Sequence, residues 1–179
     1  LVSRSGFSKQ GGFEIHIENV EAGLKLYDYL FEIGKDFELK PGTPNHPERI
    51  ESGLLSYGND MDIGDNPLEC GFDKYVDLES DIVFLGKENL KKIKKKGIKR
   101  KLMGVKIDTK YIDLIESIPL FNLQNERIGE LRSCAFSPQF KKTVGIAMIK
   151  KEFSNPLEKF LIKFDNNNIS GEICNLPIL

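Results

Sequence analysis

The sequence has little of what usually marks a metal centre, a disulfide framework or a membrane span. It contains no Trp, two His and three Cys in 179 residues. The cysteines, Cys70, Cys134 and Cys174, are odd in number and lack metal-ligand spacing, so we interpret them as reduced thiols of a cytoplasmic protein. No apolar run approaches the ~20 residues of a membrane helix. We therefore expect neither a membrane segment nor a bound metal.

The charge balance also excludes some classes of partner. A net charge of -1 gives no overall attraction to nucleic acid or to a membrane surface. The Walker loop, the serine nucleophile elbow and the HExxH zinc motif are all missing. No signal peptide is recognisable, although a chain that begins with Leu1 rather than Met could have lost one. The composition, with 40% hydrophobic residues, is that of an ordinary globular protein.

The first half of the chain shows helical patterns but few strands. A strand is predicted over residues 13–17, where Phe13, Ile15 and Ile17 alternate with polar residues and should face a core. The other predicted elements are helices over about 20–33, from about 47 and over about 86–96, and a short strand over 74–78. A lone strand with two helices is not expected to be stable by itself. We therefore interpret residues 1–84 as the end of a domain whose beginning is absent.

The second half changes character. Short alternating runs separated by Asn, Gly and Pro predict a compact antiparallel sheet or barrel over residues 100–179. Between the halves, residues 91–101 hold eight basic side chains. A solvated helix end is the default interpretation. Nucleic-acid binding is not expected, because aromatic residues do not interleave with this run.

Five segments of the chain, taken in order, carry a resemblance to a known family. They read RSGFSKQGGFEI, RIESGLLSYGNDMD, NPLECGFDKYV, DIVFLGKENL and IGELRSCAFSPQFKKTVGIAMI. Each is weak alone, but together and in order they resemble the glycine-cleavage T-protein family of folate-dependent aminomethyltransferases. The variants SRSGFSKQGG and PNHPERIESGLLSYGND look closest to its dimethylsulfoniopropionate demethylase branch, which moves a sulfonium methyl group to tetrahydrofolate.

The resemblance implies an α+β fold. Residues 1–84 would be the carboxy-terminal part of a T-protein-type folate-binding domain. Residues 85–99 would form a helix and basic linker, and residues 100–179 a small antiparallel β-barrel domain. Because the first part of the folate cavity would be missing, we expect this piece alone to be inactive. The sequence leaves a homodimer open.

The resemblance assigns two residues to tetrahydrofolate. Glu51 matches the family carboxylate that binds the pterin, where a carboxylate can accept the paired N–H groups of the ring. Its alternative is an exposed helix glutamate. Tyr57 either lines the folate cavity or packs into the core. Residues 91–101 offer a further hypothesis, in which they meet the anionic glutamate tail of folate.

Three residues are expected to meet the sulfonium substrate: Phe7, Glu14 and His16. Glu14 and His16 share one face of the predicted strand, and a carboxylate with aromatic faces can hold a cation. The branch has Trp where Phe7 stands and Tyr where His16 stands, so these departures put the substrate in doubt. The alternative for Glu14 and His16 is a solvated strand face.

Catalysis on this hypothesis needs no general acid, because a neutral thioether leaves, and no catalytic residue is assigned. Positioning and desolvation of the reactants can supply most of the rate. His46 is interpreted as structural, and Asp60 and Asp62 as solvated turn carboxylates rather than a metal loop. The alternatives are a glycine-cleavage aminomethyltransferase, another folate-dependent N-demethylase and a non-catalytic folate-binding protein of the same fold.

Overall fold

The structure is a computed structural model that describes residues 1–6, 11–42, 45–164 and 167–178. The chain divides into two compact units, Leu1–Asn45 and His46–Leu179, which we call the amino-terminal unit and the barrel unit. Together they give the mixed α+β content that the sequence predicts. Within the described ranges, no helix is both long enough and apolar enough to cross a membrane.

The amino-terminal unit consists of a short ribbon and one long helix. Strands β1 (Val2–Ser3) and β2 (Glu14–Ile15) pair antiparallel, and helix α1 (Val20–Ile33) leads into a 3-10 helix (Gly34–Phe37). Asn19 caps α1 because its side-chain oxygen accepts from the Ala22 N–H at 2.9 Å. The structure therefore confirms the helix expected over residues 20–33.

The strand expected over residues 13–17 is shorter, and its apolar face is not buried. Phe13 is 70% exposed, Ile15 44% and Ile17 42%. Helix α1 has no buried residue, and a two-stranded ribbon cannot make a core without a second layer. The prediction that these three side chains face a core is therefore wrong for the part of the chain that the structure describes.

The barrel unit begins with helices and loops. It contains α2 (His46–Glu51), a 3-10 helix (Asp73–Tyr75), α3 (Lys87–Lys96) and a last 3-10 helix (Lys151–Phe153). The strand predicted over residues 74–78 is wrong. The N–H groups of Tyr75 and Val76 donate within the 3-10 helix, to the Phe72 oxygen at 2.9 Å and the Asp73 oxygen at 3.2 Å. The Asp77 side chain then starts a turn by accepting from the Glu79 N–H at 3.0 Å.

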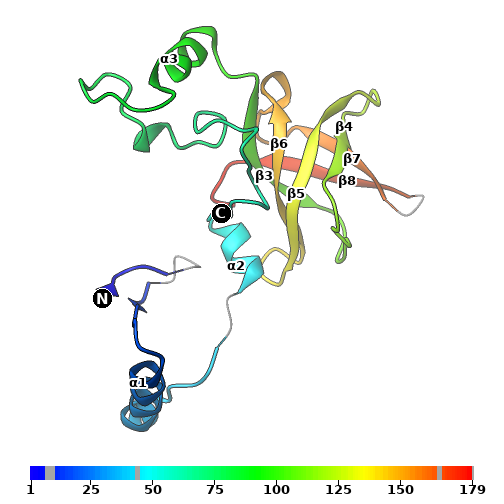
Figure 1. The fold of residues 1–179 in the computed structure, drawn as a ribbon. Helices are drawn as coiled ribbons and strands as arrows, with labels where there is room; N and C mark the ends of the chain where they lie inside the picture. The colour runs from blue at the N-terminus through cyan, green and yellow to red at the C-terminus, as the bar shows by residue number, and fades with distance from the viewer. Residues whose placement is uncertain (7–10, 43–44, 165–166, 179) are drawn as a thin grey trace. The chain divides into compact units, whose positions relative to one another are not determined.

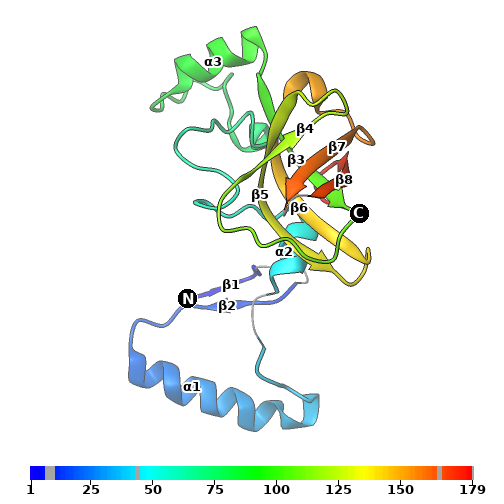
Figure 2. The same ribbon diagram turned by 90° about the vertical axis from the view of Figure 1, so that its right-hand side faces the viewer.

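Six antiparallel strands then close into a barrel in the order β3-β6-β5-β4-β7-β8 (Figures 1 and 2). They are β3 (Arg100–Ile107), β4 (Ile118–Phe121), β5 (Arg127–Ser137), β6 (Lys142–Lys150), β7 (Lys159–Phe164) and β8 (Asn167–Cys174). Closure leaves no open sheet edge. The closed antiparallel barrel expected in the second half of the chain is confirmed.

The described residues of the barrel unit form two hydrophobic cores. One fills the interior with alternate strand residues such as Val105, Leu131 and Phe160, each fully buried. The other lies on the outer face of β3 and β6, where Ile50 of α2 and Ile178 of the carboxy-terminal tail pack. Helix α2 is therefore fixed to the outside of the barrel (Figure 1).

Candidate functional site

Helix α2 ends at Glu51, the residue predicted to bind the pterin. The buried neighbour Ile50 anchors the helix in the outer core, and the Ile178 N–H donates to the Glu51 backbone oxygen at 2.7 Å. The Glu51 side chain is half-buried, and its carboxylate has no hydrogen bond or ion pair with any residue that the structure describes. An unpaired carboxylate on a well-anchored helix end can accept hydrogen bonds from a ligand.

Tyr57 lies in the turn that follows α2. It is 68% exposed, so the structure does not show the core packing that was one of its two alternatives. The turn is closed by a bridge between Tyr57 and Met61, and the Gly58 N–H donates to the Met61 backbone oxygen at 2.8 Å. Tyr57 is thus held near the end of α2 with its ring free to meet a ligand.

Asp60 is not the solvated carboxylate that the sequence predicts. It is fully buried, and its Oδ2 lies 2.6 Å from Arg49 Nη1 and 2.6 Å from the Ser56 backbone nitrogen. Ser133 Oγ donates to the other carboxylate oxygen. Asp62 does form a turn, because its side chain accepts from the Gly64 N–H at 2.7 Å. The burial of Asp60 depends on a strand far along the chain, which a local pattern cannot show.

A second ionic cluster contains two arginines and three carboxylates, and one of the arginines, Arg132, also donates to the Asp60 backbone oxygen at 3.0 Å. Arg132, 10% exposed, pairs with Asp65 and with Glu130 at 3.0 Å. Arg100 pairs with Asp65 at 3.2 Å and with Glu69 at 2.9 Å. Burial raises the pKa of Asp65, but the hydrogen bonds from Arg132 and the Asp62 backbone, with the charges of both arginines, hold that pKa below its usual value.

His46 is the first residue of α2. Partial burial, and then the charge of Arg49, lower the pKa of this imidazole, while the Asp60 charge opposes the shift. His46 is therefore neutral at physiological pH.

The residues expected to meet the sulfonium substrate belong to the amino-terminal unit. Glu14 accepts from Ser5 Oγ, and Ser5 Oγ lies 3.2 Å from Ser3 Oγ, which in turn lies 3.5 Å from His16 Nε2. Glu14 and His16 thus share one exposed polar cluster, on one face as predicted. Phe7 lies outside the described residues. The roles of all three remain predictions.

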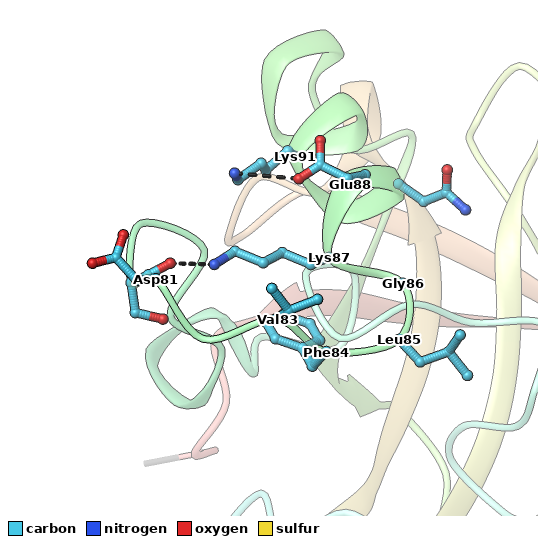
Figure 3. A pocket seen from close by; sticks show the side chains of 10 residues that line it. Asp81, Val83, Phe84, Leu85, Gly86, Lys87, Glu88 and Lys91 are labelled. Atoms are coloured by element: carbon cyan, nitrogen blue, oxygen red, sulfur yellow. Dashed lines mark hydrogen bonds and ion pairs between the residues drawn. The ribbon is translucent and has the colours of Figure 1, made fainter.

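Lys74 and Lys87 both have partners close to them in the sequence. Lys87 is buried, and its ammonium donates to the backbone oxygen of Ser80 (Figure 3). It also donates to the backbone oxygen of Ile82 at 2.9 Å. It closes the loop that lines a pocket of about 700 Å³. Lys74 lies over the Tyr75 ring at 4.8 Å from its centroid. Lys87 therefore serves the loop and is not available to a ligand.

The basic run is divided between two environments. Lys94 pairs with Glu79 at 3.1 Å, and Lys95 and Lys96 are exposed at the end of α3. Arg100 instead turns toward Glu69. The exposed lysines fit a solvated helix end, and their hypothetical contact with a folate tail stays a prediction.

The three cysteines are free thiols, and their surroundings disfavour the reactive thiolate form. Burial is the main cause that raises the pKa of Cys70, Cys134 and Cys174, each to about 11. Across the described ranges, no group of three or more His, Cys, Asp or Glu side chains is arranged to hold a metal ion.

Comparison with known proteins identifies the family of this chain. Residues 1–80 match the family model of the GCVT N-terminal domain, and residues 100–179 match that of the glycine cleavage T-protein C-terminal barrel domain. The chain belongs to the glycine cleavage T-protein family. The resemblance seen in its sequence motifs is confirmed.

Curated relatives carry two different activities in their names. A dimethylsulfoniopropionate demethylase of Ruegeria pomeroyi is 38% identical over 156 residues, which cover 87% of this chain and 42% of the relative. An aminomethyltransferase of Thermoanaerobacter pseudethanolicus is 36% identical over 160 residues, which cover 86% of this chain and 41% of the relative. The chain thus spans less than half the length of these relatives.

A solved structure shows the same fold. The glycine cleavage system aminomethyltransferase T from Bartonella henselae superposes with a TM-score of 0.86 at 23% identity. The match covers 99% of this chain and 49% of that one.

Proposed function

We propose that the protein containing this chain is a folate-dependent methyltransferase that demethylates dimethylsulfoniopropionate. The products would be methylmercaptopropionate and 5-methyltetrahydrofolate. The observation that carries the folate part is the half-buried Glu51 carboxylate at the end of α2, which has no side-chain partner among the described residues. The 38% identical relative named as a dimethylsulfoniopropionate demethylase supports the substrate.

The residues present fit a reduced pterin. Glu51 would accept the adjacent ring N–H and amino groups as a pair of charge-assisted hydrogen bonds, and the exposed Tyr57 ring would cover the ligand. When bound, tetrahydrofolate supplies the nitrogen that accepts the methyl group. Within this proposal, residues 1–84 belong to the folate-binding domain, residues 85–99 to the linker and residues 100–179 to the barrel domain.

On the substrate side, Glu14 would hold the sulfonium cation by its charge. A neutral His16 ring could contact the methyl groups, whereas a protonated ring would repel the cation. Since the leaving thioether is neutral, no side chain has to deliver a proton to it. Holding the two reactants in line and excluding water would be the protein's main contribution.

The second candidate is an aminomethyltransferase, or another folate-dependent demethylase that acts on an N-methyl compound. The 36% identical aminomethyltransferase favours it nearly as much. Phe7 and His16, which depart from the demethylase pattern, also favour it. A non-catalytic folate-binding protein is the alternative from another class.

The test uses the complete gene product, titrated with tetrahydrofolate and assayed for 5-methyltetrahydrofolate in the presence of dimethylsulfoniopropionate. Glu51→Ala should raise the Kd for tetrahydrofolate about 10- to 100-fold, since two charge-assisted hydrogen bonds are lost. The matched control is Glu116→Ala, because Glu116 is an exposed carboxylate of the same unit; it should bind like the wild type.

The possible results distinguish the folate assignment from the assignment of the methyl donor. Methyl transfer that depends on Glu51 supports both parts of the proposal. Folate binding without transfer would keep Glu51 and move the donor to an N-methyl or carrier-bound compound. The absence of folate binding in the wild type would reduce the relationship to a shared fold.

A further inference from the structure

We propose that Asp60 and Arg49 are positioning residues of the folate site, which fix the direction of the Glu51 carboxylate and of Tyr57. This inference rests on the proposed folate-dependent function. Neither side chain would touch the ligand, because Asp60 is fully buried and Arg49 is 1% exposed. They would act through the segment that carries the binding residues.

Asp60 accepts hydrogen bonds from α2 and from the turn that follows it. Its carboxylate pairs with Arg49 on α2 at 2.6 Å and accepts the Ser56 N–H at 2.6 Å. Ser133 Oγ of β5 also donates to it. Asp60 thus ties the helix before the turn and the turn itself to the barrel wall.

Arg49 makes the complementary connection. The same Nη1 atom that pairs with Asp60 also donates to the Leu54 backbone oxygen at 2.9 Å. One guanidinium therefore fixes the angle between α2 and the chain that leaves it. Glu51 lies between these two points, two residues after Arg49 and three before Leu54.

A bulge in β5 lets two neighbouring residues of the barrel wall, Arg132 and Ser133, both bond to Asp60. The register between β5 and β6 shifts between Leu131 and Ser133, so Arg132 is an extra residue in the ladder. Successive side chains of a regular strand point to opposite faces, but a bulge re-aims them. As a result, Arg132 donates to the Asp60 backbone oxygen at 3.0 Å, and its neighbour Ser133 bonds the Asp60 side chain.

This arrangement suits positioning better than stability. Helix α2 has six residues and cannot hold its own geometry, so outside contacts must set it. A buried ion pair is a poor source of stability compared with apolar side chains of similar size. In addition, Arg49 Nη2 is buried without a hydrogen-bond partner among the described residues. The hydrogen bonds of the ion pair fix the orientation of α2 relative to the turn that follows it, and an apolar pair has no such directional bonds.

The experiment compares variants of the complete gene product. The double variant Arg49→Met with Asp60→Leu replaces the ion pair by apolar side chains, and Ser133→Ala removes one bond only. Asp113→Asn is the control, because Asp113 is an exposed aspartate of the same unit. For each protein we would measure the melting temperature, the Kd for tetrahydrofolate, and KM and kcat for methyl transfer.

We expect the double variant to stay folded and to raise the Kd and the KM for tetrahydrofolate at least tenfold. Its kcat at saturating folate should stay within about threefold, because the affected group binds the ligand and does not react. Ser133→Ala should raise the Kd about threefold and lower the melting temperature by only about a few degrees, because one bond to the buried Asp60 carboxylate is lost. A purely structural role would instead lower the melting temperature and leave KM unchanged.

The results distinguish a failure of the positioning role from a failure of the proposed folate-dependent function. If Glu51→Ala loses folate binding while the folded double variant binds like the wild type, positioning by Asp60 and Arg49 is overturned and the folate site stands. If the double variant does not fold, Ser133→Ala decides, and wild-type affinity in that folded variant overturns the inference. If the wild type binds no reduced folate, the proposed function itself fails.

Discussion

The two units of this chain differ sharply in what holds them together. The barrel unit has a packed interior and a second core under α2. In the described part of the amino-terminal unit, Gly34 is the one buried residue, while large apolar side chains such as Val20, Leu24 and Tyr27 are more than half exposed. Secondary structure is present in both units, so its presence alone says little about stability.

Local interactions favour α1, but they are too weak to keep this helix folded by themselves. The Asn19 cap is worth about 1 kcal/mol, and the Glu21–Lys25 pair, 2.7 Å apart, about 0.3–0.5 kcal/mol. A helix of 14 residues remains marginal in water on such terms. The helix therefore depends on apolar packing that the described residues of its own unit do not supply.

The largest expected difference is in amide hydrogen exchange. The amides of β3 and β6 should exchange only through global opening of the barrel, whereas those of α1 should exchange through local fraying. We expect protection factors in β6 to exceed those in α1 by about 1,000-fold or more. Mass spectrometry of the 179-residue chain would measure this, and equal protection in α1 would remove the contrast between the units.

A matched pair of leucines should give the next largest effect. Leu131 is fully buried in the barrel interior and Leu24 is 63% exposed on α1. Leu131→Ala should lower the free energy of unfolding by about 2–5 kcal/mol, and Leu24→Ala by less than about 0.5 kcal/mol. Urea unfolding of both variants tests this. A large effect at Leu24 would mean that α1 is buried against something in solution.

The features that the sequence predicts correctly are those with a local or strictly periodic cause. The bounds of α1 follow from Asn19 and from apolar spacing, and the barrel strands follow from alternation over residues 100–179. The strand predicted over 74–78 is wrong because its first residues turn as a 3-10 helix, and the Asp77 side chain then starts a turn at its end.

The candidate site was only partly predictable for a different reason. Glu51 and Tyr57 come from a contiguous motif, so family resemblance is enough to nominate them. The role of Asp60 depends on Ser133, 73 residues away, and on a bulge that re-aims the strand. Nothing in the spacing of Asp60 and Asp62 distinguishes a buried anchor from a turn carboxylate, so only the tertiary structure separates them.

The smallest expected effect concerns acid sensitivity, which should follow the ionic cluster of the barrel unit. The side chain of Asp65 is 2% exposed and pairs with Arg132 and Arg100, which hold its pKa below the ordinary value of 3.8. Its contribution to stability is therefore present above about pH 4 and is lost as the pH falls through the lowered folded-state pKa.

Replacing Asp65 isolates this contribution. Asp65→Asn should cost about 2 kcal/mol at neutral pH, because Arg132 and Arg100 each lose one of their two charged partners. The difference from the wild type should shrink as the pH falls through the lowered folded-state pKa of Asp65, because the wild-type carboxyl then becomes protonated too. Urea unfolding at several pH values measures both quantities, with the exposed Asp113→Asn as control. A difference that stays constant with pH would show that Asp65 acts through packing, and the barrel unit would then owe its stability to its apolar cores rather than to this charge cluster.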